Sequence, residues 1–93
     1  MKFAFLLMGD FSPQKDHVVF PDGNTEMIGV SSLEEAKRVA KSLADSGVNC
    51  IELCGAFEET GARAIIEATG GSLPVGFVTH LPEQDPLFQA VFG

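Results

Sequence analysis

The sequence predicts a small α/β domain with an open, mostly parallel sheet and a β-α-β-α-β core. Three observations point to this fold class. Short apolar runs typical of strands recur along the chain, two segments with helical periodicity separate the later runs, and the connecting loops are short. Strands joined by single helices pair in parallel, with right-handed crossovers. A ferredoxin-like α+β sandwich is the alternative, and it would need a different strand order.

The chain length favours one domain that spans residues 1–93. A chain of this size buries only about two-thirds of the surface that it exposes when unfolded. Because 45% of the residues are hydrophobic, the chain has more apolar surface than a small domain readily hides. We therefore expect self-association into a homodimer or a higher homo-oligomer.

The first expected strand spans residues 2–9, which are apolar on both alternating faces. This pattern indicates a central strand that is covered on both sides, or a strand that a partner subunit covers. A polar loop follows over residues 10–16. Two strand-like runs, residues 17–20 and 26–30, flank a segment with the turn signals Asp-Gly and Gly-Asn, which favours a hairpin or a chain reversal.

The first helix has the clearest signals of any element. Ser31 or Ser32 is the expected N-cap, with Glu34 and Glu35 at the spacing of a capping box. Gly47 is the expected C-terminal stop. The apolar residues at helical spacing on one face are Leu33, Ala36, Val39, Ala40, Leu43 and Ala44.

A second helix is expected from about Glu58 to Thr69, ended by Gly70-Gly71. Apolar segments that are expected to be strands precede and follow it, at residues 49–54 and 73–79. Together with the first strand and the first helix, these segments complete the β-α-β-α-β pattern.

The tail, residues 81–93, is expected to dock on a protein surface. Asp85 as cap and Pro86 as first helical residue start a short helix. Its large apolar side chains are Leu87, Phe88, Val91 and Phe92. Because a frayed segment would not keep so much apolar surface in water, we expect the tail to pack on its own sheet or on a neighbouring copy.

The charge of the chain argues against several classes of partner. The formal net charge is −7, and such a surface repels nucleic-acid backbones and anionic lipid headgroups. The apolar run after Lys2 ends at Met8 and is too short for a secretory signal peptide. No stretch approaches the ~20 apolar residues that span a membrane. We expect a cytoplasmic protein that binds neither nucleic acid nor membrane.

The two cysteines, Cys50 and Cys54, fit a reducing compartment. On one strand their Cα atoms would lie about 13 Å apart, at a rise of about 3.3 Å per residue. A disulfide needs less than about 7 Å, so the two thiols are not expected to bridge each other.

Candidate binding residues are expected where the strands end. Ligands of open parallel sheets collect outside the carboxyl ends of the strands. The candidate ligand-binding residues at these ends are Asp10, Glu52, Cys54, Gly55 and His80. The sequence has neither a dinucleotide or Walker phosphate motif nor a spacing of metal ligands, so no cofactor or metal is expected.

Each candidate also has a structural interpretation. Asp10 can be a turn residue, and Glu52 can pair with a basic side chain from a helix or subunit. Cys54 can be a small buried hydrophobic residue, and His80 can be a polar residue that ends a strand.

Three functions remain open, and the sequence does not determine whether the protein is an enzyme. The first is a small-molecule-binding homo-oligomer with its pocket at the strand ends. The second is a non-catalytic assembly module whose working surface is the tail. The third is a lyase or isomerase that uses Glu52 or His80 as base, which requires both groups to reach the same substrate atom.

Several short stretches carry a resemblance to a known family. They are Gly29-Val30, Gly47-Val48, Ile51-Glu52-Leu53-Cys54-Gly55, Phe57 and Pro74-Val75-Gly76. Over most of residues 1–80 the chain resembles a family of small bacterial and archaeal proteins classed as a domain of unknown function. The family has a glycine-rich turn where this chain has Ala56 and Glu58-Glu59, so an anion-binding role of that turn is not expected here. The resemblance implies a fold and no activity.

Overall fold

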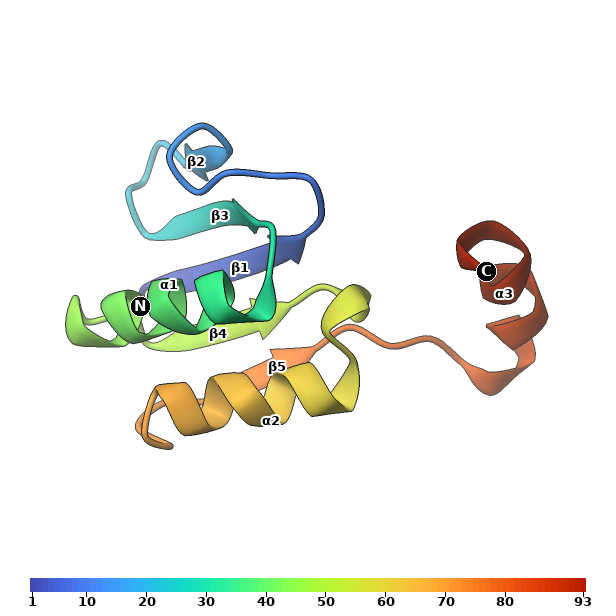
Figure 1. Ribbon diagram of the computed structural model, residues 1–93. Coiled ribbons are helices and arrows are strands. Elements are labelled where there is room, and N and C mark those ends of the chain that lie inside the picture. Colours follow the sequence, from blue (N-terminus) through green and yellow to red (C-terminus); the bar gives the residue numbers. More distant parts are fainter.

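The computed structural model describes residues 1–93, and its centre is a five-stranded sheet in the order β2-β3-β1-β4-β5 (Figure 1). The strands are β1 (Phe3–Met8), β2 (His17–Val19), β3 (Thr25–Val30), β4 (Cys50–Leu53) and β5 (Val75–Phe77). Strand β1 pairs in parallel with β3 and β4, and β4 pairs in parallel with β5. Only the edge strand β2 runs antiparallel. The predicted α/β class is confirmed, because a ferredoxin-like sandwich has an antiparallel sheet.

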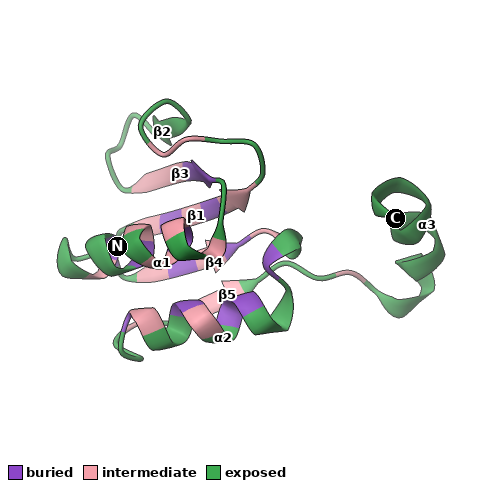
Figure 2. Cartoon of the chain, in the orientation of Figure 1, coloured by how far each residue is buried: buried purple, intermediate pink, exposed green.

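Two helices, α1 (Leu33–Asp45) and α2 (Glu58–Ala68), cover the same face of the sheet (Figure 1). The crossovers from β3 to β4 and from β4 to β5 advance in the same direction across the sheet, so right-handed connections put both helices on one side. The buried core lies between this face and the helices (Figure 2). It consists of Ala4, Leu6, Ile28, Val30, Ala36, Ala40, Leu43, Val48, Ile51, Leu53, Phe57, Ala62 and Ile65.

The other face of the sheet carries no helix, and we call it the open face. On strands β2, β3 and β1, the apolar residues of this face are Val18, Met27, Phe3, Phe5 and Leu7. They alternate with the core residues Ala4 and Leu6, which are fully buried, while Phe3, Phe5 and Leu7 are half-buried. Strand β1 is therefore central, as predicted, but helices cover only one of its faces.

The connection from β1 to β3 has no helix, and Phe11 packs it onto the sheet. A Cβ on Gly29 would lie 2.5 Å from the Phe11 Cβ, and one on Gly9 would lie 2.7 Å from the Phe11 ring. Gly29 N donates to the Asp16 carbonyl oxygen at 2.8 Å. Both glycines are needed because the ring of Phe11 occupies the space of their side chains.

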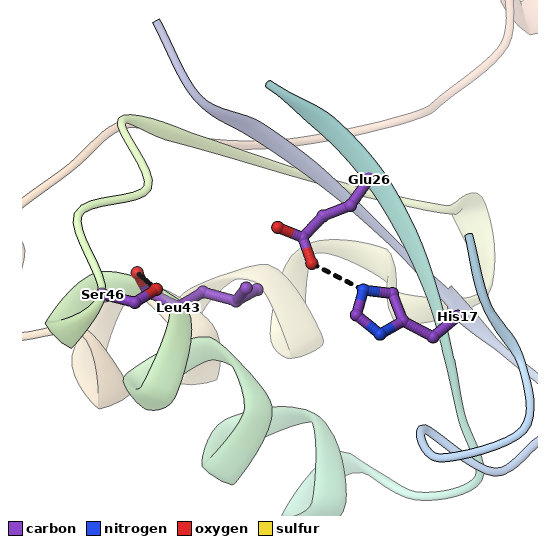
Figure 3. A network of polar contacts seen from close by, with 4 residues as sticks. All are labelled: His17, Glu26, Leu43 and Ser46. Carbon is purple, nitrogen blue, oxygen red and sulfur yellow. Dashed lines mark hydrogen bonds and ion pairs between the residues drawn. The ribbon is translucent and has the colours of Figure 1, made fainter. Parts of the chain in front are cut away.

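Strand β2 forms the expected reversal with β3 and closes that edge of the sheet. His17 Nε2 lies 2.7 Å from Glu26 Oε1, and this contact connects β2 to β3 (Figure 3). Beyond this pair lies the end of α1, where Ser46 Oγ donates to the Leu43 carbonyl oxygen at 3.0 Å (Figure 3).

Helix α1 begins as the capping signals predict. Ser32 is the N-cap, and its Oγ accepts a hydrogen bond from Glu35 N at 3.1 Å. Glu35 Oε1 in turn accepts from Ser31 N at 2.8 Å. Both serines are used, with Ser32 closing the first turn and Ser31 held by the glutamate.

The tail contains the third helix, α3 (Asp85–Phe92), which points away from the rest of the molecule (Figure 1). All residues from Leu81 to Gly93 are exposed. The expected packing of the tail on its own sheet is thus not found in the single chain (Figure 2). None of the helices combines the length and the apolar character that crossing a bilayer requires.

Candidate functional site

The carboxyl ends of β1 and β4 lie at a topological switch point. The chain leaves β1 toward β3 on one side, whereas it leaves β4 toward β5 on the other. Open α/β sheets bind ligands in the crevice between two such strands. The ends of β1, β4 and β5 are held together by backbone hydrogen bonds from Cys54 N to Leu6 O (3.0 Å) and from Val78 N to Leu53 O (2.9 Å). The strand ends predicted to share one rim therefore do so.

Cys54 joins the two strands at this switch point. Its Sγ accepts a hydrogen bond from Met8 N at 3.3 Å, and its carbonyl oxygen accepts one from Phe57 N at 3.1 Å. The thiol is half-buried and is not part of a disulfide. Cys54 thus links the end of β1 to the short 3₁₀ helix Gly55–Phe57 that leads into α2.

The turn after Cys54 passes close to the end of β5. A Cβ on Gly55 would lie 3.3 Å from the Val78 carbonyl oxygen, so glycine allows this close approach. Glu58, at the start of α2, has φ 57° and ψ −177°. This combination belongs almost only to glycine, and Glu58 is the one non-glycine residue of the chain with a positive φ.

His80 is fixed by the tail rather than by the sheet. Its Nε2 lies 2.6 Å from Asp85 Oδ1, and its ring stacks on Phe88 with the ring centroids 3.8 Å apart and the planes 7° from parallel. Phe88 stacks in turn on Phe92, at a centroid distance of 5.9 Å. These contacts make a flat aromatic surface beside the strand ends.

A cavity of about 870 Å³ lies between the strand ends, the start of α2 and the tail. Ligand pockets have volumes of about 300–1,000 Å³. Three of the predicted residues, Cys54, Gly55 and His80, line it. The other lining residues are Met8, Ala56, Glu58, Glu59, Phe77, Val78, Thr79, Asp85, Phe88, Gln89, Phe92 and Gly93.

Asp10 and Glu52, the other two predicted residues, do not line this cavity. Asp10 is exposed in the loop after β1. Glu52 pairs in register with Phe5 on one side and with Gly76 on the other. Its carboxylate leans toward β5, since a Cβ on Gly76 would lie 2.7 Å from Glu52 Oε2. The structure therefore brings together three of the five candidates.

Sequence reasoning missed the part that the tail plays in the cavity. The sequence predicts Asp85 as a helix cap and Phe88 as an apolar docking residue. In the structure Gln84 is the N-cap and Asp85 is the first helical residue, and both Asp85 and Phe88 hold His80. The spacing of Asp85 and Phe88, three residues apart, does place them on one side of a helix. Nothing in the spacing indicates that His80 is the group they contact.

The electrostatics of the site are dominated by carboxylates. Glu58, Glu59 and Asp85 line the cavity, and Arg63 pairs with Glu59 at 2.8 Å. On the open face, burial raises the pKa of the Cys50 thiol, and the nearby Glu52 carboxylate raises it further. No group of three or more His, Cys, Asp or Glu side chains is placed to hold a metal ion.

Comparison with known structures agrees with this architecture. A solved structure matches over 100% of this chain and 90% of its own, with a TM-score of 0.58 and 22% sequence identity. It is the solution NMR structure of a de novo Rossmann2x2 fold with most of its core mutated to valine. At this identity the likeness concerns the fold alone. No curated protein matches the sequence.

Comparison with protein families is more direct. A family model described as "Family of unknown function (DUF6506)" matches residues 1–93. The match spans every element described above, the tail included, and agrees with the resemblance to a small domain of unknown function. The chain belongs to this family.

Proposed function

We propose that the protein binds a small molecule at the carboxyl ends of β1, β4 and β5. The observation that carries this proposal is the cavity that gathers Cys54, Gly55 and His80 at a topological switch point. Its volume suits a small ligand, and its wall combines apolar side chains with a few polar groups, as ligand pockets do.

The charges around the cavity select the class of ligand. Glu58, Glu59 and Asp85 disfavour an anion, even though the start of α2 lies beside them, because the first-turn carboxylates already interact with the helix dipole. Phe88 and Phe92 offer aromatic faces, which attract flat and cationic groups. We therefore expect a flat, neutral or cationic molecule, such as an aromatic amine.

A cytoplasmic location is part of the proposal. The two thiols of Cys50 and Cys54 are free, and free cysteines are typical of proteins in reducing compartments. Neither contributes to a bridge that would need an oxidising environment.

A matched pair of ligands tests the proposal. Tryptamine and indole-3-acetate share a ring system and carry opposite charges. Titration of the labelled protein with tryptamine should shift the amide NMR signals of residues 54–59 and 78–80, and indole-3-acetate should bind at least about tenfold more weakly. Glu58→Gln should reduce the difference in affinity between tryptamine and indole-3-acetate. Glu67→Gln, on the far part of α2, should leave this difference unchanged. Absence of binding by neutral and cationic aromatics across a broad panel would refute the proposal.

A second candidate function is favoured by the contact between His80 and Asp85. A histidine whose ring is oriented by a carboxylate is the arrangement of a general base. Glu52 does not line the same cavity, so the expected joint reach of Glu52 and His80 to one substrate atom is not met, and the base of a lyase or isomerase would be His80 alone. This candidate predicts that the protein speeds deuterium exchange at a carbon of a bound ligand, and that His80→Gln abolishes the exchange while binding persists.

A further inference from the structure

The open face is an apolar surface that no helix of the single chain covers, although the loop with Phe11 and Asp16 packs over its Gly29 end. Rossmann-type sheets carry helices on both faces, whereas α1 and α2 both lie on one face here (Figure 1). Val18, Met27, Phe5 and Glu52 form one row across this face, in register, together with Gly76. Glu52 is the charged member of the row. Because its carboxylate lies over Gly76, Glu52 does not bring its charge next to Phe5 and Met27; Lys15 and Asp16 border the face near Met27.

The tail is a second apolar surface without a partner. Leu87 is 62% exposed, Val91 75% and Phe92 80%. Residues 86–93 have no charged side chain. Helix α3 thus presents a continuous apolar side at positions i, i+1, i+4 and i+5, which is the width of side that a helix buries against a sheet.

The tail is stiff within itself and lies away from the rest of the molecule (Figure 1). His80 is bonded to Asp85 and stacked on Phe88, so the residue before the tail is fastened to α3 itself. Pro82 begins the 3₁₀ helix Pro82–Gln84, and Pro86 lies in the first turn of α3. The proline rings fix two backbone angles in this short connection. Val78 N is still bonded to the sheet at Leu53 O, so folding α3 back onto its own sheet would require a chain reversal within residues 78–80.

We propose that two copies of this chain exchange their tails, so that α3 of each copy packs on the open face of the other. The two unpartnered surfaces match in chemistry, and each chain carries one of each. A two-fold axis satisfies both surfaces at once and leaves neither exposed, which gives a closed dimer.

The available area is large enough for a stable dimer. A buried phenylalanine removes about 150–250 Å² from water. Phe88 is 40% exposed and Phe92 80%, so covering both rings in two tails supplies about 360–600 Å² before Leu87, Val91 and the covered faces are counted. Stable interfaces bury about 1,200–2,000 Å² in total. The dimer does not require a ligand. It shares Phe88 and Phe92 with the wall of the cavity, so its test uses Val91, which does not line the cavity.

Complementary variants test the exchange directly. Val91→Lys puts a charge on the tail, and Met27→Glu puts the opposite charge on the open face. Each variant alone should dimerise about a hundredfold more weakly than the wild type, measured by sedimentation over about 1–500 µM. An equimolar mixture should restore the dimer, because each tail then finds either an apolar face or an opposite charge. Gln89→Lys, on the other side of α3, is the control and should dimerise normally.

The outcomes separate the exchange from its alternatives. A wild-type chain that stays monomeric throughout this range overturns the proposal, since the tail would then be free or packed on its own sheet. A Val91→Lys variant that still dimerises also overturns it, since the sheets would then pair face to face without the tail. Recovery of dimer in the mixture supports it.

Cys50 provides a readout that does not depend on the Met27 variant folding. Cys50 pairs with Phe3 in the sheet and therefore belongs to the open face. Its alkylation should be at least about fivefold faster in Val91→Lys than in the wild type at a concentration where the wild type is a dimer. Equal rates would contradict coverage of this face.

Discussion

Glu58 is a single residue that stores backbone strain beside the candidate site. Its φ of 57° with ψ −177° is a conformation that costs a residue with a Cβ about 1–3 kcal/mol.

The strain predicts the effect of a glycine. Glu58→Gly should raise the free energy of unfolding by about 1 kcal/mol, because glycine adopts this conformation without a steric cost. Glu59→Gly, one residue into α2, should lower it by about 1 kcal/mol. Urea denaturation of the two variants measures both changes. A loss of stability in both would show that residue 58 is not strained.

Cys50 and Glu52 form a pair on the open face whose electrostatics can be tested at the residue scale. Burial and the Glu52 carboxylate both disfavour the thiolate and raise the pKa of Cys50. In Glu52→Gln, the pKa of Cys50 should fall, and its alkylation by iodoacetamide at pH 7.5 should accelerate about threefold. Glu67→Gln is the control and should not change the rate. Peptide mass spectrometry resolves Cys50 from Cys54.

The same raised pKa has a consequence for stability. The folded state favours the neutral thiol, so Cys50 contributes to the free energy of unfolding. This contribution is fully present below the ordinary pKa of a cysteine and is lost as the pH rises through the raised pKa of the folded state. The wild type should therefore lose stability at alkaline pH, and Cys50→Ala should lose less over the same interval.

At the scale of elements, the strands depend on two glycines in different ways. A Cβ on Gly29 would meet the Cβ and Cγ of Phe11 at 2.5 and 2.7 Å, close to the backbone of a packed loop. A Cβ on Gly76 would meet the carboxylate of Glu52 at 2.7 Å, at the free end of a flexible side chain.

The two substitutions to alanine should therefore differ. Gly29→Ala should cost about 1–3 kcal/mol, because the Phe11 loop must move off β3. Gly76→Ala should cost less than about 1 kcal/mol, because Glu52 can swing aside. Thermal unfolding of both variants provides the comparison. An equal cost would mean that the loop holding Phe11 moves as freely as the Glu52 side chain.

At the scale of the whole molecule, the tail decides between a monomer and an assembly. The tail contributes nothing to the buried core, so deleting residues 86–93 should leave the fold of the remaining chain intact. It should remove self-association, and with it the rise of the melting temperature with protein concentration that a dimer shows. A truncated chain whose melting temperature still rises with concentration would place the interface elsewhere.

The class of the fold was predictable because its signals are local. The caps and periodicity of α1, the glycine stops and the apolar runs each depend on neighbouring residues, and their order implies parallel strands with right-handed crossovers. The predicted bounds of α1 and α2 agree with the structure within one residue at the ends. Strand β5 is shorter than predicted, Val75–Phe77 instead of 73–79, because only these residues pair with β4.

The sequence alone thus determined which segments are strands and helices, and that the strand ends next to Cys54 and Gly55 and before His80 meet at one edge. Only the tertiary structure decided that Glu52 leans over Gly76, that Asp10 lies outside the cavity, and that Asp85 and Phe88 hold His80. The reason is physical. Periodicity and capping act between near neighbours in the chain, whereas the direction of a side chain or of the tail depends on the space that distant residues leave free.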